Sequence, residues 1–254
     1  MKPTIKHLPG LAAGLGILAA ALRLAQDLLG RDAKELLILW HPLDLLVWAV
    51  TIAMVVLTVL AVRKADCSDR YEDNFGPSSY AAIGCTALIG GILSAAMADL
   101  GAFSRLEVIR CWLGLLSVPA LFWLGICRIQ GKRPFFGFHA LVCLYLTVHT
   151  VSHYQVWCAR PLVQDFFFPM AASVLLTLFA YFQTAFDVSM GSRRKQLAAG
   201  ALAGFFCLAA LAGGADRMLY LGGAVWALTN LCSLTPAPRR RPNPITETTR
   251  EGTE

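Results

Sequence analysis

The chain has 254 residues, of which 57% are hydrophobic and only 15% are charged, and its formal net charge is +6 at pH 7. Soluble domains usually carry about 25% charged residues, so this composition argues against a soluble domain and predicts a membrane protein. No GxxxxGKS/T, GxGxxG, GxSxG or HExxH motif is present in the sequence, so we expect no ATP hydrolysis by the chain itself.

Apolar segments follow one another along the chain, each close to the about 20 residues that a helix needs to cross a bilayer. Lipid offers the backbone no hydrogen-bond partner, and no alternating strand pattern is visible, so these segments are predicted to be helices. The expected fold is all-α, a polytopic transmembrane helical bundle of about eight spans. A transmembrane domain over 1–234 is predicted to hold spans at 8–29, 43–62, 79–99, 108–127, 136–157, 166–187, 197–214 and 216–234. Residues 235–254 are rich in Pro, Thr and charge, which predicts a disordered cytoplasmic tail.

Lys2 and Lys6 precede the first apolar stretch as basic residues precede that of a signal peptide, but no polar cleavage region separates this stretch from Arg23, so we expect the span to be retained. The basic residues predict the orientation as well, because they concentrate in cytoplasmic loops. With the N-terminus inside, the inner segments carry the basic clusters at 63–70, 128–133, 193–195 and 239–241. We therefore expect both termini in the cytoplasm and a location in the cell membrane. The positive charge is then a topology signal, and no nucleic-acid partner is expected.

The segment HTVSHYQVWCARPLVQDFFF begins with His149 and His153, which are four residues apart and therefore share one helix face. Such a pair can chelate a metal ion, and zinc is commonly bound by histidine. A zinc site needs a third ligand, and the sequence offers only His41, Cys158 and Asp165 near that end of the span. We therefore expect both histidines to line a pocket and to bond Ser, Thr or backbone carbonyl groups of other helices. A metal site at the two histidines is the alternative.

The spacing between His139 and His153 permits a second alternative. Fourteen residues turn a helix almost four times, so the two side chains share a face about 21 Å apart. This arrangement resembles that of the ligands of two stacked haems in b-type cytochromes, and the resemblance covers this helix alone. The opposing ligands would be His7 and His41, which lie on two different predicted helices, so haem is not the expected cofactor.

Charged groups are costly inside a bilayer, and here they lie close to the predicted span boundaries. We interpret them as solvated helix ends: Asp44, Asp99, Arg110, Asp187, Asp216 and Arg217. Asp99 is also a candidate for lining a ligand-binding vestibule. Two amides within spans, Gln183 and Asn230, are expected to bond neighbouring helices or to contact a ligand. A small-molecule pocket is expected where His153 meets the segment before Pro169.

Small residues spaced four apart predict close helix packing at Gly10 with Gly14, Gly91 with Ala95, and Gly200 with Gly204, expected inside the bundle, with a face between two copies of the chain as the alternative. Spans without a soluble domain leave the bundle interior as the space for function. The expected function is therefore that of a small-molecule transport (permease) component or a ligand-sensing membrane module. Its expected partners are the lipid bilayer, a small-molecule ligand and other membrane subunits. The alternatives are a haem- or metal-binding subunit of a membrane oxidoreductase and an assembly subunit. No catalytic residue is assigned, and no cofactor is expected, with haem and zinc as the alternatives.

Overall fold

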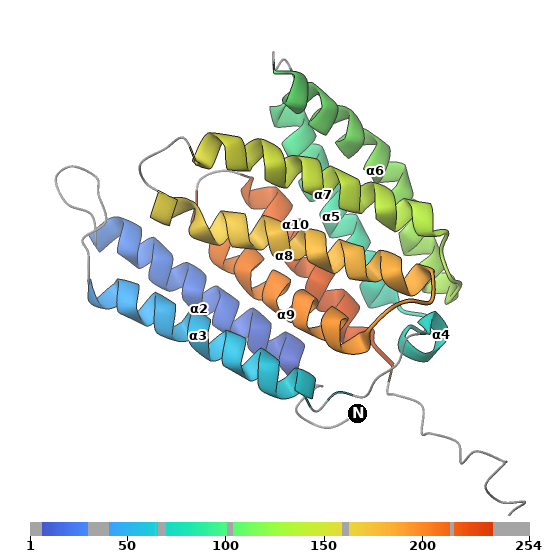
Figure 1. Cartoon of the computed structure of the whole chain (residues 1–254), viewed down its shortest axis with the longest axis horizontal. Helices are drawn as coiled ribbons and strands as arrows, with labels where there is room; N and C mark the ends of the chain where they lie inside the picture. The colour runs from blue at the N-terminus through green and yellow to red at the C-terminus, as the bar shows by residue number, and fades with distance from the viewer. Residues whose placement is uncertain are drawn as a thin grey trace, which may run out of the picture.

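The computed structural model describes residues 7–29, 41–63, 65, 70–100, 104–158, 163–213 and 216–235, and within these ranges the chain forms helices and no strand. One isolated antiparallel bridge joins Phe75 to Leu234. The all-α prediction is therefore confirmed, while all but the first residue of the predicted tail lies outside the described residues. The helices, labelled in Figure 1, are α2 (Leu8–Leu29), α3 (Pro42–Arg63), α4 (Tyr71–Asn74), α5 (Ser79–Ala98), α6 (Arg105–Gln130), α7 (Phe136–Trp157), α8 (Val163–Asp187), α9 (Arg193–Ala210) and α10 (Arg217–Cys232).

Each predicted apolar segment coincides with one long helix, and the ends differ by at most four residues. The largest difference is in α9, which begins at Arg193 rather than at 197. Arg193 is buried, and its guanidinium donates to the side chain of Asn74 over 3.2 Å. The helix can begin at this buried charged residue because its guanidinium is hydrogen-bonded inside the protein. The single turn α4 was not predicted and lies in a segment that reads as a polar loop.

Among the described residues, five helices are long and apolar enough to cross a membrane: α2, α3, α5, α6 and the Phe166–Asp187 part of α8. The protein is therefore a membrane-type helical protein. Among the other long helices, α10 has only 16 residues, and α9 begins with three basic residues. More than half of the residues of α9 and of α10 are buried. Their sequences therefore suit contact with other helices more than contact with lipid.

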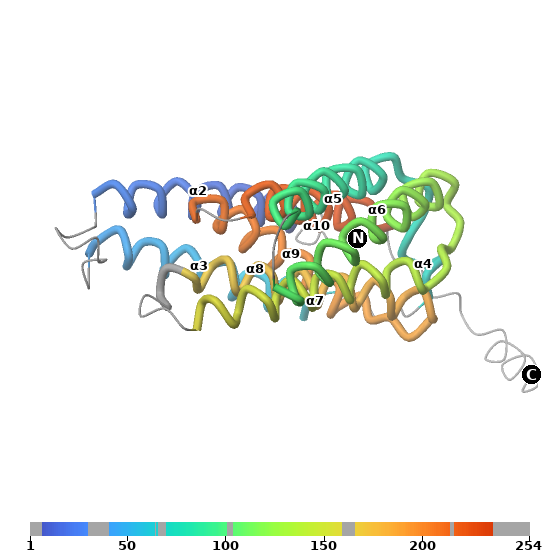
Figure 2. The backbone as a smooth tube through the Cα atoms, turned by 90° about the horizontal axis from the view of Figure 1, so that it is seen from above, coloured from blue at the N-terminus to red at the C-terminus, as the bar shows by residue number. Residues whose placement is uncertain are grey.

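Six of the helices close into a ring. Each packs on the next one along the chain from α5 to α10, and α10 packs back on α5. The hairpin of α2 and α3 packs against α9 on the outside of this ring. Figure 1 shows the long helices running along a common direction. Figure 2 shows the bundle from a perpendicular view, with α2, α10 and α5 along one side and α3, α8 and α7 along the other.

Successive long helices run in opposite directions, so the bundle has two ends. We call the end at which α7 begins the His139 end, and the end at which α7 finishes the His153 end. At the His139 end, the amide of Thr235 after α10 donates to the carbonyl of Asn74 in α4 over 2.9 Å. The first residues of α2 and the last residues of α10 therefore lie at the same end of the bundle (Figure 1).

The helices α5 and α10 approach until their backbones nearly touch. A Cβ atom added at Gly91 would lie 2.7 Å from the carbonyl oxygen of Met218, and one added at Gly222 would lie 2.5 Å from that of Ala87. Only glycine permits this approach, because any other residue would place a Cβ atom against the opposite backbone. These two glycines therefore allow α10 to close the ring.

Of the other two predicted pairs of small residues, one packs closely against neighbouring helices and one does not. Gly200 and Gly204 of α9 do pack closely, since an added Cβ would lie 2.8 and 2.7 Å from side chains of α8 and α10. Gly10 and Gly14 are exposed, with no described atom within 4 Å of an added Cβ, so the expectation that this pair packs inside the bundle is wrong. The buried glycine of α2 is Gly16, where an added Cβ would lie 2.9 Å from Leu208 of α9.

The first prediction concerns the contact that closes the ring. Gly91→Ala should destabilise the protein by about 1–3 kcal/mol, the usual cost of overpacking, because the new methyl group meets backbone atoms that cannot rotate away. Gly90→Ala is the matched control, because an added Cβ there meets no described atom within 4 Å. Thermal unfolding of both variants in one detergent makes the comparison. Equal melting temperatures for the two variants would contradict this packing.

Candidate functional site

Polar residues from four helices of the ring meet inside its His153 end. One comes from the end of α5, one from the start of α6, three from the last turns of α7, and one from immediately before α10. The last of these has left-handed backbone angles, φ 52° and ψ 28°, which aspartate tolerates better than most residues. We define this His153-end cluster as Asp99, Arg110, His149, Ser152, His153 and Asp216.

Arg110 and Asp99 form a buried ion pair within this cluster. The guanidinium Nε of Arg110 donates to Asp99 Oδ2 over 2.6 Å, and Nη2 donates to the other carboxylate oxygen. The remaining Nη1 donates to Ser152 Oγ over 2.8 Å, which ties α6 to α7. The side chains of Arg110 and Asp99 are only 10% and 9% exposed. Their interpretation as solvated helix ends is therefore wrong.

His149 and His153 lie beside Asp216, which comes from much later in the sequence. His153 Nε2 is 2.9 Å from Asp216 Oδ2, and His149 Nε2 is 4.0 Å from the same oxygen. The two imidazole rings are tilted by 50° to each other, with their centroids 4.4 Å apart. The interpretation of Asp216 as a solvated helix end is also wrong, because its side chain is only 15% exposed. The ring brings it against α7 through the contact between α10 and α5.

Several buried polar atoms of this region have no hydrogen-bond partner among the described residues. They include both ring nitrogens of His149, Nε2 of His153 and Oδ2 of Asp216, so the 2.9 Å approach is not a well-formed hydrogen bond. The expected bonds from the histidine rings to Ser or Thr of other helices are therefore not observed for His149. The hydroxyl groups of Tyr145 and Tyr220 are also buried without a partner, close enough to interact electrostatically with Asp216.

A cavity of about 280 Å³ opens beside the cluster, between the start of α6, the end of α7 and the start of α8. Its lining includes Arg110, Ser152 and His153 of the cluster. It also includes Trp157 and Phe166, whose rings stack with centroids 5.7 Å apart. Drug-sized ligands occupy pockets of about 300 Å³ or more, so this cavity suits a small solute or an ion. It lies where the sequence placed a small-molecule pocket, near His153 and the segment before Pro169.

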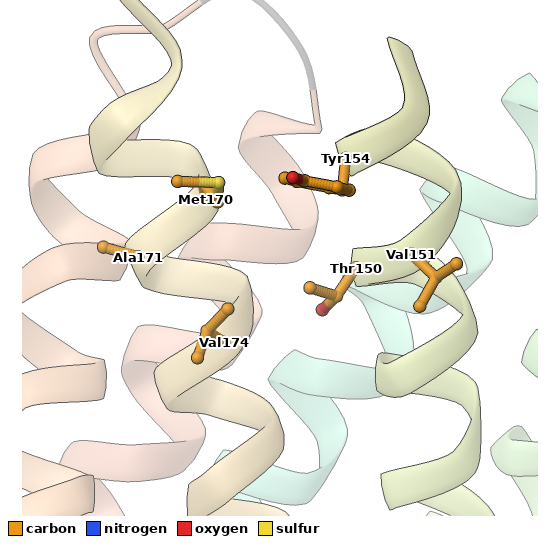
Figure 3. Close-up of a pocket in the computed structure, with 6 residues that line it drawn as sticks. All are labelled: Thr150, Val151, Tyr154, Met170, Ala171 and Val174. Atoms are coloured by element: carbon orange, nitrogen blue, oxygen red, sulfur yellow. The ribbon is translucent and has the colours of Figure 1, made fainter. Parts of the chain in front are cut away.

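A second hollow, of about 440 Å³, lies between α7 and α8 and is shown in Figure 3. Met170, Ala171 and Val174 of α8 and Thr150, Val151 and Tyr154 of α7 line it, and the side chains of Thr150 and Tyr154 point toward α8. The hydroxyl of Thr150 already donates to the carbonyl of its own helix at 2.8 Å. Few polar groups are left to recognise a solute, so this hollow is a weaker candidate than the His153-end cluster.

The other predicted site residues, Gln183 and Asn230, lie at the His139 end and are bonded to each other. The amide of Gln183 donates to Asn230 Oδ1 over 3.3 Å, and Arg128 donates to the same oxygen over 2.6 Å. The expected bonding between helices is therefore observed for this pair. The structure does not bring these two amides together with His149 and His153.

His139 and Asp187 form a second buried pair at the same end. His139 Nδ1 is 2.5 Å from Asp187 Oδ2, and Arg133 donates to the backbone carbonyl of Asp187. The Asp187 side chain has no exposed surface, so its interpretation as a solvated helix end is wrong. In the neighbouring turn α4, burial raises the pKa of the Tyr71 hydroxyl against the opposing effect of Arg128. Tyr71 therefore stays protonated beside this polar group.

The helix packing does not support the haem alternative. His7 precedes α2 and His41 precedes α3, and both helices pack against α9. His139 and His153 lie on α7, which packs on α6 and α8. The two pairs of histidines are therefore not on facing helices.

Of the third ligands suggested by the sequence for a metal, the side chain of Asp165 lies outside the described residues, and Cys158 is exposed at the end of α7.

Comparisons with protein families, with curated proteins and with solved structures find no match to this chain. The assignment of the site therefore depends on its geometry. Sequence reasoning missed Asp216, Arg110, Tyr145 and Tyr220 as members of the site. The available signal was the position of Asp216 and Arg110, each an ionisable residue next to a long apolar segment.

The second prediction tests the buried pair. Asp99→Asn or Arg110→Gln alone should each cost about 3–5 kcal/mol of stability, because the remaining charge is left buried without its partner. The double variant should lose less than the sum of the two single variants, because the pair is removed together. Thermal unfolding of the four proteins measures this coupling. Arg105→Gln, an exposed change in the first turn of α6, should have little effect. Additive losses would show that the two side chains are not coupled.

Proposed function

We propose that this chain is a multi-pass membrane protein that binds a small polar solute or ion in its His153-end cluster and takes part in transporting or sensing it. The observation that supports this function is the group of buried, unpartnered polar atoms beside the 280 Å³ cavity. A buried polar atom without a partner costs about 1–3 kcal/mol. A ligand that bonds these atoms would remove that cost, so the arrangement favours binding over a purely structural role.

An apolar layer separates the two polar ends of the ring. Val142 of α7 and Leu176 and Phe179 of α8 lie between the two polar ends, and all three are buried in the hydrophobic core. Transport requires this apolar layer to open. Sensing requires only that the ligand binds more tightly to one arrangement of the helices than to another. Both uses begin with binding at the same cluster.

The long helices are proposed to form eight spans, with the His139 end and both termini in the cytoplasm of a cell-membrane protein. The distribution of basic residues supports this orientation, because such residues favour the cytoplasmic side. Within the described ranges, the His139 end carries Arg63, Arg70, Arg128, Lys132, Arg133, Arg193, Arg194 and Lys195, and the His153 end carries Arg23, Arg105, Arg110 and Arg217.

The third prediction tests this topology. Reporter proteins fused after residue 131 or after residue 190 should report the cytoplasm, and a reporter fused after residue 160 should report the opposite side. The measurement is the activity of a pair of reporters, one active only inside the cell and one only outside. A cytoplasmic signal from the fusion after residue 160 would contradict the proposed spans.

The fourth prediction tests binding. The purified protein is heated in detergent with a panel of small carboxylates, amines, amino acids, phosphate and divalent cations. A true ligand at about 100 times its Kd should stabilise the folded state by about 2.7 kcal/mol. The stabilisation should be lost in Asp216→Asn and kept in His7→Gln, which changes an exposed histidine outside the cluster. Binding at this cluster is wrong if no compound stabilises the parent, or if Asp216→Asn responds equally.

A further inference from the structure

We propose that the ligand of the His153-end cluster is a divalent transition-metal ion of the zinc class, held by His149, His153 and Asp216. This inference rests on the proposed binding function of the same cluster and names its ligand. The three side chains each offer one ligand atom, and these atoms all lie within 4.8 Å of one another. Zinc binds imidazole nitrogen and carboxylate oxygen at about 2.0–2.2 Å, so its ligand atoms in a tetrahedral site lie roughly 3.3 Å apart. The distances of 2.9 and 4.0 Å from Asp216 bracket this value.

The hydrogen bonding of the three side chains favours an ion over a structural role. His149 is 1% exposed, and neither of its ring nitrogens has a hydrogen-bond partner among the described residues. The facing atoms of His153 and Asp216 lie 2.9 Å apart without a well-formed hydrogen bond between them or to another described group. A single cation would bond all three residues at once. A water molecule could serve as the fourth ligand, as in sites that bind zinc through three protein residues.

The charge of the cluster also fits a cation. Arg110 is the nearby cationic residue, and its charge is balanced by Asp99 in the bidentate pair. This pairing leaves the carboxylate of Asp216 as the unbalanced charge when the histidines are neutral. A bound divalent ion would neutralise that charge.

The ligand types decide the class of ion. Magnesium and calcium prefer oxygen ligands, whereas imidazole suits zinc, nickel, copper and iron. Two imidazoles with one carboxylate therefore favour zinc and its neighbours. The cavity gives the ion an approach, because His153 lines it and Glu107 lies at its edge, while His149 is buried behind His153.

The test uses the full-length protein, purified in detergent and stripped of metal with a chelator. Calorimetric titration with Zn²⁺ at pH 7.5 should show one ion per chain, and Mg²⁺ should not compete. His149→Gln, His153→Gln and Asp216→Asn should each weaken Zn²⁺ binding at least about tenfold, because each removes a ligand. His139→Gln is the matched control on the same helix, because His139 pairs with Asp187 at the other end, and it should bind Zn²⁺ as the parent does.

A second measurement needs no variant. Co²⁺ added to the stripped parent should give the intense visible absorption of a tetrahedral site, and Zn²⁺ should abolish it. The absence of both Zn²⁺ binding and this spectrum overturns the metal inference, as does unchanged Zn²⁺ binding in all three ligand variants. If an organic solute instead stabilises the parent but not Asp216→Asn, the metal inference fails and the binding function stands. If neither metal nor any solute acts through Asp216, both fail.

Discussion

The close approach of α5 and α10 is the constraint on which the candidate site depends. Because Gly91 lies against the backbone of Met218, the first turn of α10 is held at one position along α5. Asp216 comes immediately before that turn, so the same contact sets the position of its carboxylate relative to His149 and His153. The contact that closes the ring therefore also brings the residues of the cluster together. A small displacement of α10 along α5 would separate the carboxylate from the imidazoles without changing any residue of the cluster.

Buried charge is the second feature that the ring has to accommodate. An ion removed from water is costly unless it is paired and bonded, and Arg110 meets both conditions through Asp99 and Ser152. Asp216 has no such bidentate partner, because the described groups within ion-pair distance of it are the imidazoles of His149 and His153, and Arg110 bonds Asp99 instead. The cluster therefore contains one charge that is stabilised by the fold and one that requires a proton or a ligand. Evolution of a purely structural core would favour removing the second charge, because an apolar replacement usually costs little.

The sequence predicted the helices well and the site only in part, for a physical reason. Length and hydropathy are local properties, so the eight apolar segments and their approximate ends could be predicted from single stretches of the chain. The neighbours of each helix are not a local property, and the sequence did not indicate that α10 closes on α5. Asp216 therefore read as a solvated helix end, although its side chain is only 15% exposed. His149 and His153 were found because their spacing alone places them on one face, whereas their third partner required the tertiary structure.

The two histidines near opposite ends of α7, His139 and His149, differ in how their rings are bonded. His139 is buried, as His149 is, and it too lies beside an aspartate of another helix. At that end, however, His139 bonds Asp187 directly, and the side-chain oxygen of Asn230 accepts from Arg128, while Asp187 Oδ1 and Gln183 Oε1 are buried without a partner among the described residues. The same residue types on the same helix thus give a histidine with a bonded ring nitrogen at one end, His139, and a histidine with neither ring nitrogen bonded at the other, His149. His139 and His149 are both buried, so the difference in the bonding of their rings is what favours the surroundings of His149 as the place for a ligand.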